Sequence, residues 1–197
     1  MIKLLIFDIG GVLIEFNEID YIRYVAKKHK LSVRSFSRAL MPMIDLMEAG
    51  RMDLPEVEAR MADKLHIPNA WLEWDSTYER IAKPKTDVKK LLVRLSRRYK
   101  VVLLSNVSET RYDVMKSDLI HDLKFRTFAS CYLKMRKPGP RIYRYVLSKM
   151  KVSADEALFV DNLLVNVRGA RKVGIRGIQF KSYAQLVREL RKAGIKG

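Results

Sequence analysis

The chain has almost no cysteine: Cys131 is the only one among 197 residues. An intrachain disulfide is therefore impossible, and a structural zinc site is disfavoured because such sites draw on several cysteines. The three histidines, at 29, 66 and 121, lack the spacing of metal ligands and are interpreted as surface residues. With a single thiol, a reducing cytoplasm is the expected compartment.

Long apolar runs are missing too, so no membrane-spanning segment is expected. A secretory signal peptide is not expected either, because one acid and two glycines interrupt the first apolar stretch. There is no internal repeat and no low-complexity segment. The length and the apolar content fit one compact domain, or a domain with a modest insertion.

Positive charge is abundant and unevenly placed. The formal net charge is +17, from 39 Lys and Arg against 22 Asp and Glu. Residues 1–85 carry 13 of each sign, so the whole excess lies in residues 86–197. Such a field attracts phosphorylated metabolites or nucleic acid. A solvated basic surface is the favoured interpretation, and a nucleic-acid partner is the alternative that stays open.

The second part of the chain alternates short apolar runs with helical periodicity. Continuous apolar strands separated by helices indicate an α/β fold with a doubly wound parallel sheet, covered on both faces. The pattern predicts strands near 2–7, 101–104, 125–130, 157–160 and 175–180, and helices near 86–98, 108–120, 140–150, 164–173 and 182–193.

Residues 17–82 show helical periodicity without a convincing strand. Gly50 is typical of a helix C-terminus, and Leu54-Pro55 of a helix start. The aromatic residues at 71, 74 and 78 share one helical face and are interpreted as core packing. We therefore predict a core of residues 1–16 and 83–197, with an all-helical insertion after the first strand at 17–82.

The first strand delivers one carboxylate, Asp8, into a turn built on Gly10 and Gly11. An unpaired carboxylate is costly in a strand core, so its place is the sheet edge where ligands of open α/β sheets bind. A turn aspartate that bonds its own backbone is the alternative. Backbone groups of the two glycines are candidates for binding phosphate oxygens.

Two further strands also end on polar residues. One is followed by Ser105 and Asn106, and the other by Asp161 and Asn162. The carboxyl ends of parallel strands meet at one edge of the sheet, so these residues are expected to converge on Asp8. In isolation, Ser105 and Asn106 could merely cap the following helix.

Lys137 stands before a proline and a predicted helix, between these two strands in the sequence. A carboxylate, a hydroxyl, a lysine and a second acid suit phosphoryl transfer. Asp8 can attack phosphorus to form an aspartyl-phosphate, while Ser105 holds phosphate oxygens and Lys137 offsets charge. Asp8 and Asp161 can share a Mg²⁺.

In these segments the sequence resembles the haloacid dehalogenase superfamily, and within it the small phosphatases with a helical cap. The resemblance covers nearly the whole chain. Within the family, the sequence looks most like the bacterial α-D-glucose-1-phosphate phosphatase group, which is similar in size, cap position and Arg-Lys-Pro motif. It implies a Rossmann-like core, a cap that closes over the substrate, and Mg²⁺-dependent hydrolysis. The motifs are residues 7–13, 104–106, 135–143 and 159–162, the last continued by Asn166, Ala170 and Gly174.

By this resemblance Asp8 is the nucleophile and a Mg²⁺ ligand. Ser105 binds phosphate with help from the Asn106 backbone, and Lys137 steadies both the nucleophile and the transferring phosphate. The acid–amide pair at 161–162 supplies the remaining metal contact. The implied substrate is a small phosphorylated metabolite, and the protein is expected to be a monomer or homodimer.

Two positions depart from the family pattern. Gly10 stands where a second aspartate of the family usually acts as general acid. Losing a general acid typically lowers the reaction rate by about 10²–10⁴-fold. Its backbone carbonyl can still bind Mg²⁺. Asn162 replaces a second acid, which lowers ligand charge. The sequence therefore predicts a preference for good leaving groups, such as a sugar 1-phosphate or an acyl phosphate.

Two alternatives remain open. A 2-haloacid dehalogenase uses the same aspartate and needs no proton for its leaving group, although this cap is short for such an enzyme. The second alternative is a core that has lost catalysis and only binds a ligand. The two missing carboxylates and the net charge of +17 motivate it.

Overall fold

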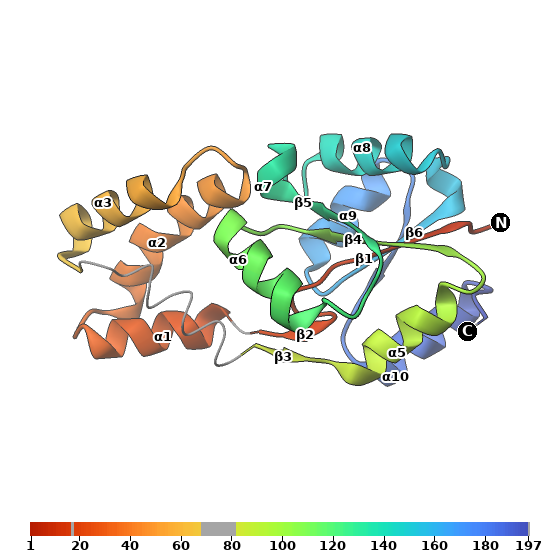
Figure 1. Cartoon of the computed structure of the whole chain (residues 1–197), viewed down its shortest axis with the longest axis horizontal. Coiled ribbons are helices and arrows are strands. Elements are labelled where there is room, and N and C mark those ends of the chain that lie inside the picture. Colours follow the sequence, from red (N-terminus) through yellow and green to blue (C-terminus); the bar gives the residue numbers. More distant parts are fainter. Residues whose placement is uncertain (17, 68–81, 197) are drawn as a thin grey trace.

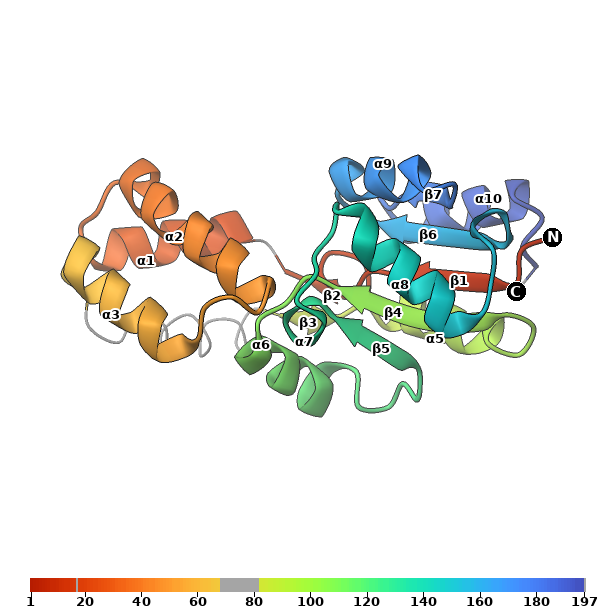
Figure 2. The same cartoon turned by 90° about the horizontal axis from the view of Figure 1, so that it is seen from above.

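A five-stranded parallel sheet forms the centre of the protein, in the order β5-β4-β1-β6-β7. The structure, a computed structural model, describes residues 1–16, 18–67 and 82–196. The predicted parallel sheet is confirmed, and Figures 1 and 2 show helices on both of its faces. The strands are β1 (Leu4–Phe7), β4 (Lys100–Ser105), β5 (Arg126–Ala129), β6 (Ala157–Asp161) and β7 (Arg176–Gln179).

Alternate side chains of β1 serve the two faces, as the pleat of a strand requires. Leu5 and Phe7 belong to the hydrophobic cluster that includes α5 (Thr86–Leu95) and α10 (Tyr183–Lys192). Leu4 and Ile6 belong to the cluster that includes α8 (Pro140–Met150) and α9 (Leu164–Lys172). All four side chains are fully buried, which explains the continuous apolar run in the sequence.

The register of the sheet brings the ends of three strands level. Phe7 pairs with Leu103 on one side and Val160 on the other, so Asp8 emerges beside the ends of β4 and β6. The N–H of Asp8 donates to the carbonyl of Val160 at 2.9 Å, which extends this pairing by one residue. Strand order reverses around β1, the place where open α/β sheets bind ligands.

Three of the described helices form a separate unit beside the carboxyl ends of the strands. They are α1 (Glu18–Lys28), α2 (Val33–Glu48) and α3 (Leu54–Leu65), and they pack around their own hydrophobic cluster. We call them the helical unit. Figure 2 shows it on the side toward which the strands point. The predicted aromatic stripe at 71, 74 and 78 lies outside the described residues.

A two-stranded antiparallel ribbon connects the helical unit to the sheet. Its strands, β2 (Ile14–Glu15) and β3 (Lys83–Pro84), have two residues each. Such short strands give no periodic signal in a sequence, so they were not predicted. Each lies next to an end of the predicted insertion.

The remaining differences from the predicted elements are local. The helix expected near 108–120 is α6 (Glu109–Val114) followed by a π-helical turn, η1 (Met115–Leu119). A short helix, α7 (Ser130–Leu133), follows β5, and a 3₁₀ turn, η2 (Ala154–Glu156), precedes β6. In the described ranges, no helix combines the length and the apolar character needed to cross a membrane.

Gly50 does end α2, as predicted. It adopts a positive φ of 61°, which disfavours any residue with a side chain. A Cβ added there would also lie 2.2 Å from the carbonyl oxygen of Cys131 in α7. This glycine therefore permits both the turn and a close approach between the helical unit and the sheet.

Candidate active site

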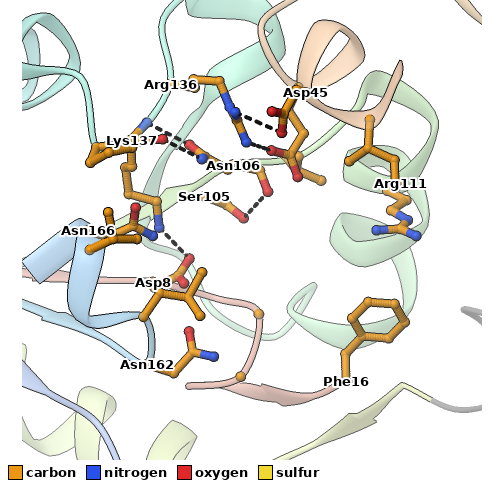
Figure 3. A pocket seen from close by; sticks show the side chains of 18 of the residues that line it. Asp8, Phe16, Asp45, Ser105, Asn106, Arg111, Arg136, Lys137, Asn162 and Asn166 are labelled. Carbon is orange, nitrogen blue, oxygen red and sulfur yellow. Dashed lines mark hydrogen bonds and ion pairs between the residues drawn. The ribbon is translucent and has the colours of Figure 1, made fainter. Parts of the chain in front are cut away.

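A cavity of about 560 Å³ opens between the carboxyl ends of the strands and the helical unit. Figure 3 shows side chains from both parts around it. Of the predicted site residues, all but one line the cavity, and the exception is Asp161. Those on its wall are Asp8, Gly10, Gly11, Ser105, Asn106, Lys137 and Asn162.

The turn after β1 shapes the floor of the cavity. Gly11 has a positive φ of 76°, and a Cβ there would lie 2.3 Å from Nδ2 of Asn162. The Gly11 N–H donates to the Ile14 carbonyl at 2.7 Å, and Lys85 Nζ donates to the Gly11 carbonyl at 3.0 Å. At Gly10, by contrast, an added Cβ would meet no atom within 4 Å. Only Gly11 is required by geometry.

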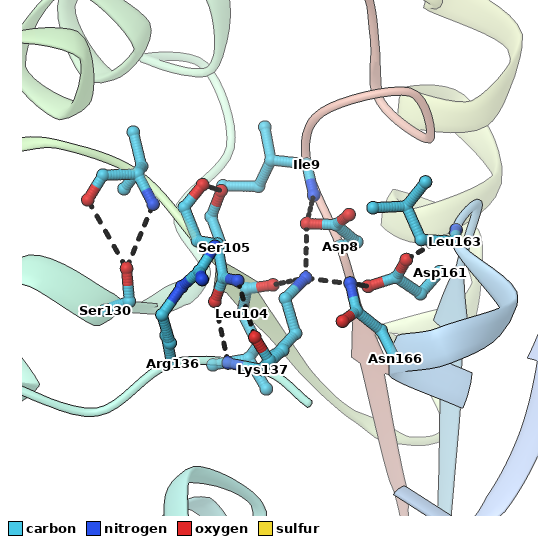
Figure 4. Close-up of polar contacts among 12 residues, drawn as sticks. Asp8, Ile9, Leu104, Ser105, Ser130, Arg136, Lys137, Asp161, Leu163 and Asn166 are labelled. Atoms are coloured by element: carbon cyan, nitrogen blue, oxygen red, sulfur yellow. Dashed lines mark hydrogen bonds and ion pairs between the residues drawn. The ribbon is translucent and has the colours of Figure 1, made fainter. Parts of the chain in front are cut away.

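Lys137 is the buried centre of the polar network, with 1% of its side chain exposed. Its Nζ lies 2.8 Å from Asp8 Oδ1, 2.7 Å from Asp161 Oδ2 and 3.1 Å from the Leu104 carbonyl (Figure 4). An ammonium group has three hydrogens, so these contacts use them all. In this arrangement Lys137 orients the nucleophile candidate and has no further hydrogen to give to a phosphate.

Two carboxylates share this one ammonium group. Burial first, and the charge of Asp161 second, raise the pKa of Asp8 to about 7 in spite of Lys137. Burial disfavours the charge of Lys137, but the carboxylates of Asp161 and Asp8 outweigh it and raise the pKa of Lys137. With all three groups ionised the network carries a net charge of −1, which a cation in the cavity would offset.

Both carboxylate oxygens of Asp161 accept hydrogen bonds from the protein. Its Oδ1 accepts from the Leu163 N–H at 2.8 Å, and its Oδ2 accepts from Lys137 and from Asn166 Nδ2, the latter at 3.0 Å. It is completely buried behind the cavity wall. Asn162, the next residue, lines the cavity against Gly11.

The cavity wall therefore carries oxygen donors that fit a divalent cation. These are the carboxylate of Asp8, the amide oxygen of Asn162 and the backbone of Gly10, a hard-ligand set that suits Mg²⁺. Within the described residues, no group of three or more His, Cys, Asp and Glu side chains is arranged to hold a metal. A bound cation would rely on neutral oxygens and water beside the carboxylate.

Asn106 holds the Lys137 loop in place. Its Nδ2 donates to the Lys137 carbonyl at 2.9 Å, and its Oδ1 accepts from the Lys137 N–H at 2.8 Å. Ser105 is buried on the cavity wall, and among the described residues its hydroxyl makes one long contact, of 3.4 Å, to the Asn106 carbonyl. A contact of that length is weak, which leaves the hydroxyl able to turn toward a phosphate oxygen.

Sequence reasoning missed several supporting residues. Ser130 is fully buried and accepts the Val107 N–H at 3.0 Å, so it fixes the loop after β4. The Arg111 guanidinium lies 5.0 Å above the ring of Phe16, and Figure 3 shows this pair across the cavity from Lys137. Among 39 Lys and Arg residues, nothing in the sequence singles out Arg111.

Arg136 joins the sheet to the helical unit. Its Nη1 lies 2.8 Å from Asp45 Oδ1, and its Nη2 lies 2.7 Å from Glu48 Oε2, both on α2. The sequence motif contains Arg136, but its partners are about 90 residues away in the chain and became visible only in the structure.

Comparisons with known proteins identify the family and the fold. A family model described as haloacid dehalogenase-like hydrolase matches residues 2–174. The chain is 26% identical to the sesquiterpene phosphatase astK of Aspergillus oryzae, over 96% of this chain and 95% of that protein. It is 24% identical to the D-ribitol-5-phosphate phosphatase of Bacteroides thetaiotaomicron, over 96% and 97% respectively. The magnesium complex of the HAD family enzyme bt-2542 from B. thetaiotaomicron shares the fold, with a TM-score of 0.82 at 22% identity over 95% of this chain and 98% of that one.

Proposed function

The chain belongs to the haloacid dehalogenase-like hydrolases, and from this premise we propose that it is a phosphatase that uses Asp8 as its nucleophile. The observation that carries the proposal is the position of Asp8. Its carboxylate sits on the floor of the cavity, held by Lys137 Nζ at 2.8 Å, with the Ser105 hydroxyl on the same wall. The two phosphatases of similar length support the reaction class.

The proposed reaction has two steps. An oxygen of Asp8 attacks phosphorus, the bond to the ester oxygen breaks, and the departing alkoxide takes a proton from water because Gly10 offers none. Water then hydrolyses the aspartyl-phosphate, which releases inorganic phosphate and restores the Asp8 carboxylate. Lys137 keeps the nucleophile oriented throughout, and Asn106 keeps the Lys137 loop oriented.

The oxygen ligands on the cavity wall suit Mg²⁺ as the cofactor. We propose that Asp8, the Gly10 carbonyl and Asn162 hold it, with Asp161 acting behind them to position Lys137. The burial of Asp161 behind the cavity wall and its bond to Lys137 Nζ support this division of roles. When bound, Mg²⁺ supplies charge that stabilises the phosphoryl group during transfer.

A preference among leaving groups follows from the absence of an acidic side chain at Gly10. Esters with a stabilised leaving oxygen, such as an acyl phosphate or a sugar 1-phosphate, are expected to react faster than simple alkyl phosphates. The two relatives do not decide the body of the substrate, since one is named for a sesquiterpene and the other for a sugar-alcohol phosphate. The narrower resemblance to glucose-1-phosphate phosphatases stays a prediction.

We also propose that the helical unit acts as a cap, with the core at 1–16 and 83–197 and the cap at 17–82. The separate hydrophobic cluster of α1, α2 and α3 and the ribbon of β2 and β3 support this division. The cytoplasmic location and the choice between monomer and homodimer stay predictions, and a nucleic-acid partner stays an open alternative to the favoured solvated basic surface.

The experiment that tests the proposed function measures phosphate release from acetyl phosphate, glucose 1-phosphate and p-nitrophenyl phosphate. Each substrate is assayed with Mg²⁺, with EDTA and with the variant Asp8→Asn. Turnover that requires both Mg²⁺ and Asp8 supports the proposal. Halide release from 2-chloropropionate without metal would instead indicate a dehalogenase, and inactivity of folded protein on both panels would indicate a binding protein.

A further inference from the structure

The upper part of the cavity differs in chemistry from its floor. The floor is polar, with Asp8, Ser105 and Asn162. Large apolar side chains from both halves of the molecule line the same cavity. The helical unit contributes Ile19, Met41 and Ile44, and the sheet side contributes Met115, Leu163 and Val165.

Three of these apolar side chains are exposed to an unusual degree. Ile19 is 51% exposed, Leu163 52% and Val165 55%. Single exposed apolar residues are common and need no explanation. Here, however, they gather on one cavity from two separate segments, with buried Ile44 and Met115 beside them. Exposed apolar groups that cluster at a concave site are typical of a surface that a ligand covers.

Several of the charged groups on these walls are already engaged with one another. Arg136 lies 2.8 Å from Asp45 and 2.7 Å from Glu48, so each of the two α2 carboxylates that line the cavity is paired with a guanidinium nitrogen. The Arg111 guanidinium stacks on Phe16. A polyhydroxyl body placed against Ile19, Leu163 and Val165 would bury hydroxyl groups against apolar side chains, which is unfavourable without hydrogen-bond partners.

We propose that the substrate is the phosphate ester of an apolar alcohol, preferably an aromatic one. This rests on the proposed function: the phosphate binds at the floor beside Asp8, and the esterified body lies between α2 and the start of α9. An aryl ester also suits the missing acid at Gly10, because a phenolate leaves without being protonated. Two independent features of the cavity, its apolar walls and its lack of an acid, thus select the same class of ester.

The test varies apolar size while keeping the leaving group constant. Phenyl, 4-ethylphenyl and 4-butylphenyl phosphate release phenols of nearly equal acidity, and 4-(hydroxymethyl)phenyl phosphate is the polar counterpart. We expect kcat/KM to rise by up to about fourfold for each methylene that becomes buried. The polar counterpart should react more slowly than the ethyl compound. Equal rates across the series, or a preference for the polar ester, would overturn the proposal.

Two matched variants test whether the apolar lining of the cavity causes the preference for alkyl-substituted esters. Val165→Asn changes an exposed residue on the cavity rim, and Val93→Asn changes a residue of α5 that is 45% exposed and does not line the cavity. We expect Val165→Asn to reduce the preference for the butyl over the unsubstituted ester severalfold, while Val93→Asn leaves it unchanged. The same loss in both variants would assign the preference to general surface effects and overturn the proposal.

Two further measurements separate this inference from the proposed function. Acetyl phosphate has no apolar body, so its Asp8-dependent turnover reports on the phosphatase chemistry alone. If acetyl phosphate is turned over while kcat/KM is the same for all the aryl phosphates, only the apolar-substrate inference is overturned. Calorimetric binding of 4-alkylbenzylphosphonates, which cannot be hydrolysed, reports on the walls alone. Affinity that increases with alkyl length supports the apolar site even if no ester is turned over, and constant affinity contradicts it.

Discussion

Two neighbouring glycines in the turn after β1 differ in their tolerance for a side chain. Gly11 combines a positive φ of 76° with a close approach to Asn162, whereas Gly10 faces open space. We predict that Gly10→Asp folds normally and places a carboxylic acid on the cavity wall near Asp8. Its kcat/KM should rise for alkyl phosphates, by as much as 10²-fold, and change little for aryl phosphates, because only alkoxides need the proton.

Gly11→Ala is the matched control for this substitution. Its φ of 76° is strained for a residue with a side chain, and its Cβ would displace the Asn162 amide, so we expect loss of stability and of turnover for every substrate. If Gly10→Asp raised alkyl and aryl rates equally, or lowered both, the role of Gly10 in selecting leaving groups would be wrong.

The raised pKa of Asp8 makes the stability of the metal-free protein depend on pH. The ordinary value is 3.8 and the folded value about 7, so the folded state binds the proton more tightly than the unfolded state. This contribution to stability is complete below pH 3.8 and is lost as the pH rises through about 7. We predict that Asp8→Asn, which lacks the buried charge, gains stability relative to the wild type as the pH rises from 4 to 8.

Urea unfolding in EDTA at pH 5, 6, 7 and 8 measures this difference between the two proteins. Added Mg²⁺ should narrow it at high pH, because a cation favours the ionised Asp8 of the wild type. Parallel stability profiles for the two proteins would show that Asp8 titrates normally in the folded state.

The contact between α2 and the Lys137 loop depends on two ion pairs of unequal burial. The side chain of Glu48 is 15% exposed and that of Asp45 is 54% exposed, while Arg136 bonds both. Exposed pairs contribute at most about 1 kcal/mol, and more buried charged hydrogen bonds about 1.5–3 kcal/mol. We predict that Glu48→Gln raises KM and weakens stability more than Asp45→Asn does.

A double-mutant cycle of Glu48→Gln with Arg136→Gln isolates this coupling, with the Asp45 cycle as its comparison. The readouts are the free energy of unfolding and KM for one aryl phosphate. Equal coupling in the two cycles would mean that the difference in burial between the two carboxylates has no energetic consequence.

The sequence predicted those elements that have a strong period or a distinct boundary. The strand at 157–160 and the helix at 140–150 appear at 157–161 and 140–150, because continuous burial and an initial proline mark them. The ribbon of β2 and β3 is too short to leave a pattern. The π-helical turn η1 keeps the apolar residues that suggest an α-helix, so periodicity could not separate the two.

The same limit applies to the site. Parallel topology was enough to bring Asp8 and Ser105 together, since it places strand ends at one edge, whereas Lys137 lies in a loop before α8 and was assigned from the sequence motif around it. It could not say which of Asp161 and Asn162 faces the cavity, because adjacent residues leaving a strand differ only in direction. The engagement of Arg136 with α2 also required the tertiary structure, as its partners lie far away in the chain.

The charge of the whole molecule acts on its substrate at long range. A net charge of +17 attracts a phosphate dianion from well beyond contact distance, although the network around Asp8 is itself negative. Salt affects these two electric fields differently. It screens the field of the surface charges, with a Debye length of about 10 Å at 0.1 M and about 3 Å at 1 M. It barely affects the field of the buried network around Asp8. Ionic strength should therefore change capture of the substrate more than its chemical conversion.

We predict that KM for acetyl phosphate rises severalfold between 0.02 M and 0.5 M NaCl at constant free Mg²⁺, while kcat stays nearly constant. The matched ligand is 4-butylphenol, a neutral product analogue whose inhibition constant should not rise with salt, because apolar contacts are not screened. If KM were flat, the excess charge of residues 86–197 would have no part in binding phosphate esters, and a different anionic partner would have to account for it. If both ligands weakened in parallel, salt would be acting on the fold of the cavity and not on attraction between charges.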